Sequence, residues 1–192
     1  AAAERCEQIL HAMQQHGIRP NLSSFKATLM AWRQVASDCS YSPFRAQRLL
    51  EWMIRLYDNG ENDSCLPDSD CFATCLQIWS RSGHDEAPQR AEALLVTNER
   101  LYERMQLESL RPRVTAFNAV LAAWARSNQD RASERAAGIL TFMQSLPNVV
   151  PDPASYCTVL SALSRSQPRS EATAYKATAL LQLALAQAKQ QP

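Results

Sequence analysis

The chain has 192 residues, of which 46% are hydrophobic, so it can bury a sizeable core and does not have the composition of a disordered protein. Lys and Arg number 20 against 19 Asp and Glu, and the resulting net charge of +1 excludes a strong overall attraction to nucleic acid or acidic membranes. The 4 glycines and 10 prolines favour helices, because sheet-rich folds need glycine at tight turns.

Hydrophobic periodicity predicts nine helices, because apolar residues recur within each at intervals of three and four. We expect them at residues 2–17, 22–38, 43–60, 69–83, 85–108, 114–128, 130–146, 153–166 and 170–190. The stretch 58–64 reads as a polar loop and not as a linker between domains. The chain starts with three alanines inside a predicted helix, so we expect it to be a piece of a longer protein without its targeting segment.

Four of these helices share one pattern, in which an aromatic residue is followed by Leu after four positions and by Trp or Leu after seven. The aromatic residues recur after 47, 45 and 39 residues. This spacing places three large apolar side chains on one helical face, so we expect a core and not platforms for stacking bases. The residues are Phe25, Leu29, Trp32, Phe72, Leu76, Trp79, Phe117, Leu121, Trp124, Tyr156, Leu160 and Leu163.

A second helical pattern lies between these segments. A basic residue and Ala are followed by a pair of aliphatic residues, as in Arg45-Ala46 before Leu49-Leu50 and Arg135-Ala136 before Ile139-Leu140. Each unit is therefore a first helix, a turn, a second helix and a turn that contains proline. Neither helix can bury its apolar face alone, but stacked neighbours can, which predicts an all-α solenoid. We expect one array, with the second helix of a partial repeat at 1–21 and repeats at 22–68, 69–113, 114–152 and 153–192.

The third unit reads Val-Thr-Ala-Phe-Asn-Ala-Val-Leu-Ala-Ala-Trp-Ala-Arg-Ser over 114–127, and a later Phe142-Met143 is followed by Val150-Pro151-Asp152. This pattern resembles the pentatricopeptide repeat family. The Trp-x-Arg-Ser ending and the long units are similar to the expanded algal type. The resemblance covers nearly the whole chain and implies a right-handed superhelix whose first helices line the concave side. It also implies binding of single-stranded RNA in a mitochondrion or chloroplast, with about one base per repeat.

The resemblance also implies which residues read a base, because the family uses the fifth and the last residue of a repeat. These positions pair Lys26 with Asp68 and Asn118 with Asp152. Asn118 with Asp152 is a usual family pair that favours uracil, since an amide and a carboxylate can together satisfy a base edge. In the second repeat the fifth residue is Ala73, which offers no side-chain hydrogen bond.

Other positions depart from the family or follow it in part. The last residue of the second repeat is Arg113, and the fourth repeat presents Cys157 with no closing residue. The second residue of a repeat, where the family has an aliphatic wedge between bases, is Asp70 in the second repeat, and this carboxylate would face RNA phosphates unfavourably. The wedge positions are Ser23, Asp70, Thr115 and Ala154.

A row of arginines resembles the family's phosphate contacts. Arg81, Arg126 and Arg165 lie two positions after the Trp or its Leu substitute, and Arg33 lies one position earlier in its repeat. Basic residues also outnumber acidic ones on the predicted first helices. The alternative is that each Arg is a solvated side chain that the dipole at a helix C-terminus favours.

Two functions follow from these patterns. The first is an RNA-binding solenoid that acts in organellar RNA processing, stability, translation or ribosomal RNA contact. The alternative, favoured by the irregular base-reading pairs, is a protein-binding scaffold subunit of a larger organellar assembly. No Cys/His metal spacing, phosphate-binding glycine loop or catalytic motif is present, so we expect no enzyme, no metal and no cofactor. We also expect no membrane insertion, because no apolar run approaches the about 18 residues of a spanning helix.

Overall fold

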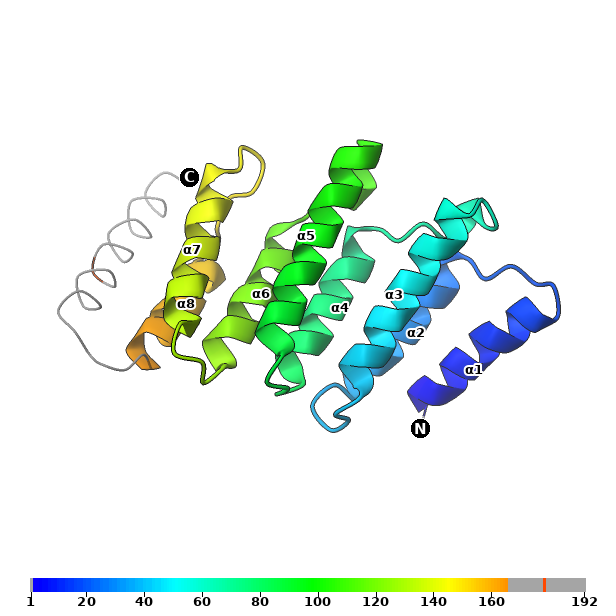
Figure 1. Ribbon diagram of the computed structural model, residues 1–192, viewed down its shortest axis with the longest axis horizontal. Coiled ribbons are helices and arrows are strands. Elements are labelled where there is room, and N and C mark those ends of the chain that lie inside the picture. The colour runs from blue at the N-terminus through cyan, green and yellow to red at the C-terminus, as the bar shows by residue number, and fades with distance from the viewer. Residues whose placement is uncertain (1, 166–177, 179–192) are drawn as a thin grey trace.

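The computed structural model describes residues 2–165 and 178, and the regular secondary structure of this part is helical, without a strand (Figure 1). The prediction of an all-α fold is confirmed for these residues. The predicted helix at 170–190 lies outside the described residues, apart from position 178. The α-helices are α1 (Ala2–Gln15), α2 (Leu22–Gln34), α3 (Ser42–Asp58), α4 (Ser69–Arg81), α5 (Ala87–Met105), α6 (Val114–Arg126), α7 (Ala132–Ser145) and α8 (Pro153–Arg165). None of the described helices has the length and hydropathy to cross a bilayer.

Most helices begin within two residues of the predicted start and end two to four residues early. Side-chain caps explain several starts, because Asn21 and Asp68 accept hydrogen bonds from backbone N–H groups three residues later. The early end of α5 has a local cause, since Gln106 adopts a left-handed conformation with φ of 53°. At the end of α2, the Val35 N–H turns back to the Trp32 and Arg33 carbonyls and the regular helix stops.

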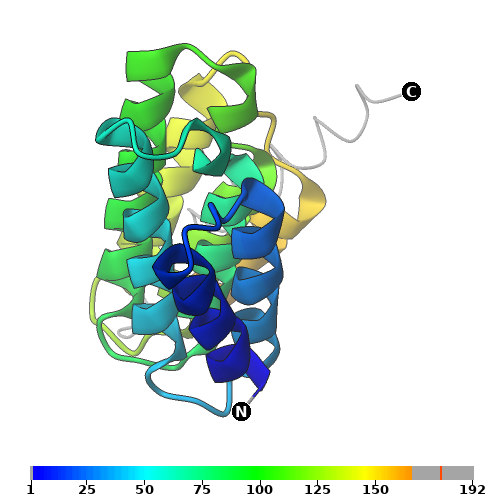
Figure 2. The same cartoon turned by 90° about the vertical axis from the view of Figure 1, so that its right-hand side faces the viewer.

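The helices form two layers (Figure 1). The first helices α2, α4, α6 and α8 lie in one layer, and each contacts the next directly. The second helices α3, α5 and α7 lie in front of them in this view, and each packs against the first helix before it and the one after it. Helix α1 packs against α2 at the N-terminal end, and Figure 2 shows the layers from that end.

The core lies between the layers and contains the predicted first-helix residues. Phe25, Phe72 and Phe117 are 0% exposed, and the three tryptophans at the seventh-residue positions are at most 5% exposed. These side chains are therefore core residues, as predicted, and are not available as stacking platforms. Leu160 was expected to be buried but is half-buried, because α8 packs against α6 and α7 and no further described helix follows it.

Two buried asparagines, one in the loop after α3 and one on α5, bind the turns that lead into first helices. The Asn62 side-chain amide donates to the Pro20 carbonyl at 2.6 Å, and that of Asn98 donates to the Leu110 carbonyl at 2.8 Å. The polar loop predicted at 58–64 is thus partly buried, and the short 3-10 helix η1 (Asp63–Cys65) follows Asn62 directly. A second 3-10 helix, η2 (Glu108–Leu110), carries the carbonyl that Asn98 binds. Buried backbone oxygens need such partners, so these bonds hold the proline turns in place.

Candidate nucleic-acid interface

The face of the first helices that points away from the second layer is accessible to solvent. On α4 it carries Asp70, Thr74, Gln77 and Arg81, which recur at intervals of three and four and therefore share one side of the helix. On α6 the same face carries Thr115, Asn118, Ala122 and Arg126, which are also three or four residues apart. Because α2, α4, α6 and α8 lie side by side, these stripes together form one surface of short polar side chains with an arginine in the last turn of each helix. We call this surface the first-helix face.

The structure brings the predicted base-reading residues together at the junctions between successive first helices. The last residue of a predicted repeat is the N-cap of the next first helix, as Asp68 is for α4. Stacking places the fifth residue of the preceding first helix beside that cap. Lys26 consequently forms an ion pair with Asp68, and the Asn118 side-chain amide donates to both Asp152 carboxylate oxygens at 3.0 and 3.1 Å.

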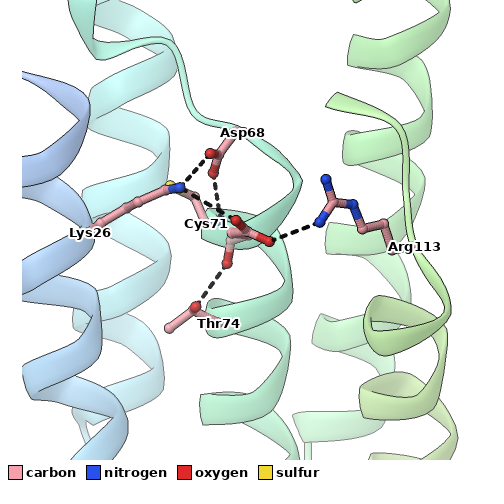
Figure 3. Close-up of polar contacts among 6 residues, drawn as sticks. Lys26, Asp68, Cys71, Thr74 and Arg113 are labelled. Carbon is pink, nitrogen blue, oxygen red and sulfur yellow. Dashed lines mark hydrogen bonds and ion pairs between the residues drawn. The ribbon is translucent and has the colours of Figure 1, made fainter. Parts of the chain in front are cut away.

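The Lys26 junction, in which Figure 3 labels Lys26 and Asp68, contains a second carboxylate that was not expected to take part. The Lys26 ammonium lies 3.4 Å from Asp70 as well as pairing with Asp68, and its hydrogen bond with Asp68 raises the pKa of Lys26. Burial disfavours the charged form of Asp68, but hydrogen bonds from Lys26 and Cys71 outweigh it and hold the pKa of Asp68 below its usual range. Arg113 approaches Asp70 from the other side at 3.7 Å.

The Asn118 junction is closed by a serine that the sequence patterns did not single out. The buried Ser155 hydroxyl donates to the Asn118 side-chain oxygen at 2.6 Å, and the Ser155 N–H donates to Asp152 at 2.8 Å. Both ends of the Asn118 amide thus have protein partners. Ser155 stands three residues after the capping Asp152, and this cap spacing is the signal that would have found it.

The hydrogen bonds at this junction predict a dependence of stability on pH. Burial acts to raise the pKa of Asp152, but the bonds from Asn118 and Ser155 prevail and the pKa is lowered. A carboxyl whose pKa is lower in the folded state stabilises the fold above its unfolded pKa of about 3.9, and this contribution is lost as the pH falls through the folded pKa. Asp152→Asn keeps a capping side chain but does not titrate.

We therefore expect the melting temperature of the wild type to fall more steeply than that of Asp152→Asn between about pH 5 and about pH 2. Asp130→Asn, an exposed aspartate in the turn before α7, is the control and should keep the wild-type slope. Thermal unfolding followed by circular dichroism measures this. Parallel slopes for wild type and Asp152→Asn would contradict the stabilising role of this carboxylate.

At the junction between α4 and α6 the two predicted partners have different surroundings. Ala73 is only 6% exposed and belongs to the core, whereas the Arg113 side chain is exposed and contacts Asp70. Cys157, the fifth residue of the fourth repeat, is exposed on α8. Among the described first helices, Asn118 with Asp152 is therefore the junction that brings an amide and a carboxylate together.

The four candidate phosphate-binding arginines all lie in the last turn of a first helix, but their partners differ. The Arg33 guanidinium donates to the Gln77 side chain at 3.0 Å, and that of Arg126 donates to the Ser80 carbonyl at 2.8 Å. Both bonds connect neighbouring first helices. Among the described residues Arg165 bonds to Ser161 of its own helix, and Arg81 is exposed. Each guanidinium keeps further N–H donors that these bonds do not use.

No family model matches the chain, and no curated protein sequence is similar to it. Within residues 2–165, no group of three or more His, Cys, Asp or Glu side chains is arranged to hold a metal ion. The buried thiols of Cys71 and Cys75 belong to the core, and burial raises the pKa of Cys71 to about 12, which makes it a poor nucleophile or ligand.

Proposed function

We propose that this protein is a pentatricopeptide-type α-solenoid that binds single-stranded RNA along its first-helix face. The observation that carries the proposal is the recurrence of one junction at two of the three described steps between first helices. The fifth residue of a first helix meets the N-cap of the next, as in Lys26 with Asp68 and Asn118 with Asp152, and an arginine ends each first helix. A surface that repeats in this way suits a polymer whose own units repeat.

The packing of the layers supports placing this face on the inside of a curved array. Neighbouring first helices contact each other directly, whereas the backbones of neighbouring second helices lie farther apart. A stack whose members are closer on one side bends toward that side. The first-helix face is therefore proposed to line the concave surface of a right-handed superhelix, as the family resemblance implies.

Binding through this face is proposed to depend mainly on phosphate contacts. Arg81, Arg126 and Arg165 occupy equivalent positions on three successive first helices and are all exposed. Lys26 and Asp68, in contrast, neutralise each other, so they contribute little to reading a base. We infer modest sequence preference and strong salt dependence, because phosphate contacts release counterions and carry no sequence information. The resemblance places this activity in a mitochondrion or chloroplast, in RNA processing, stability, translation or contact with ribosomal RNA.

The experiment that tests this proposal is filter binding of the wild type to poly-U and poly-A across a salt series. We expect both polymers to bind, with affinity that falls as salt rises and with a small preference for poly-U. Asn118→Ala should remove the preference and leave the salt slope unchanged, because a base contact specifies whereas a phosphate contact positions. Absence of binding to both polymers at low salt would contradict the proposal.

The alternative, a protein-binding scaffold, is favoured by an apolar pocket on the opposite layer. The pocket has a volume of about 250 Å³ and lies between α5 and the segment at the end of α7. Tyr102, Phe142, Leu146 and Val149 line it, and Phe142 is 44% exposed. The binding experiment above separates the two functions, because a scaffold without RNA would show no salt-dependent binding to either polymer.

A further inference from the structure

Two basic side chains from different parts of the chain converge on Asp70. The Lys26 ammonium reaches it from α2 at 3.4 Å, and the Arg113 guanidinium reaches it from the turn before α6 at 3.7 Å (Figure 3). Asp70 is not the cap of α4, because Asp68 accepts the capping hydrogen bond. Thr74 binds the Asp70 backbone carbonyl and not its carboxylate. The Asp70 side chain therefore contacts mainly these two cations.

A carboxylate and a phosphodiester are both oxyanions that accept charge-assisted hydrogen bonds from Lys and Arg. We propose that Lys26 and Arg113 form a binding site for a phosphodiester of single-stranded RNA, and that Asp70 occupies this site in the free protein. The proposal rests on the proposed function, since it adds a phosphate contact to the same first-helix face. Asp70 then acts as an internal competitor that lowers the affinity of this face for RNA.

The exposure of the Arg113 and Asp70 side chains makes the exchange feasible. The side chain of Arg113 is 64% exposed and that of Asp70 is 61% exposed, and ion pairs this open to solvent hold weakly. Lys26 retains Asp68 as a partner when Asp70 is absent. The charge that becomes available on loss of the Asp70 carboxylate is therefore mostly that of Arg113, which amounts to about one additional phosphate contact.

The test compares Asp70→Asn with Asp58→Asn in filter binding to poly-U across a salt series. Asp58 is a matched control, because it pairs with Arg104 at 2.8 Å on the second-helix layer and its substitution changes the net charge equally. Asp70→Asn should bind about fivefold more tightly at about 0.1 M salt, with a slope of log affinity against log salt steeper by about 0.7, the value for one contact on a single strand. Asp58→Asn should match the wild type. Circular dichroism verifies that both variants are folded.

Adding Lys26→Gln and Arg113→Gln to Asp70→Asn tests whether these two cations cause the gain in affinity for poly-U. The triple variant should lose this gain. Equal effects of Asp70→Asn and Asp58→Asn, or a gain that persists in the triple variant, would overturn the site. If wild type binds in a salt-dependent manner but Asp70→Asn gains nothing, only this inference fails. If neither protein binds poly-U, the proposed function fails with it.

Discussion

Replacing Arg81, Arg126 and Arg165 together by alanine is expected to weaken binding to poly-U by about 100-fold at about 0.1 M salt. Three phosphate contacts on a single strand account for about two units of slope in log affinity against log salt, so the variant should also show a salt dependence flatter by that amount. Poly-A should lose affinity to the same extent, because the lost contacts position the strand and do not read it. Filter binding at four or more salt concentrations measures both quantities.

The control for this variant removes three arginines from the other layer. Arg48 on α3, Arg100 on α5 and Arg131 at the start of α7 are exposed, and their replacement by alanine changes the net charge equally. We expect this control to retain nearly the wild-type slope, since these side chains do not lie on the first-helix face. Equal losses in the two triple variants would show that net charge alone governs binding and would contradict the proposed interface.

Trp79→Ala is expected to destabilise the fold by about 3–5 kcal/mol, because it leaves a cavity at a position with no solvent exposure. The Trp79 ring packs edge-on against Phe44, with ring centroids 5.0 Å apart. Its indole N–H has no hydrogen-bond partner among the described residues, so the loss comes from packing. Urea unfolding followed by circular dichroism measures the change as a lower midpoint.

Two further alanine variants calibrate this loss. Trp52 is a partly buried tryptophan against Phe25 and His11, so Trp52→Ala should cost clearly less than Trp79→Ala. Ile9 on α1 is 60% exposed, and Ile9→Ala should leave the unfolding midpoint nearly unchanged. Similar costs for the two tryptophans would mean that Trp79 is not the core residue that its position indicates.

Local sequence signals predict the helices and the core well because their physical causes are local. Cap residues such as Asn21 and Asp68 mark where helices begin, and the spacing from Phe72 to Leu76 and Trp79 selects the buried face. Helix ends are less accurate, because the turn at Val35 and the left-handed Gln106 depend on backbone geometry that no residue pattern specifies.

The junction residues are predicted in pairs, but their further partners are not. Arg33 meets Gln77, and Asp70 meets both Lys26 and Arg113, across separations of more than 40 residues. These contacts depend on the exact register between stacked helices. The aromatic residues recur after 47, 45 and 39 residues, so the repeats differ in length. A comparison of equivalent positions therefore does not reveal this register.

The central claim is that single-stranded RNA lies along the first-helix face, and photo-crosslinking with poly-U that contains 4-thiouridine tests it most directly. Mass spectrometry of the digested complex identifies the peptides that carry nucleotide adducts. We predict adducts in α2, α4, α6 and α8, on peptides that include Lys26, Asn118 and Cys157. Adducts confined to α3, α5 and α7, or none at low salt, would contradict the claim.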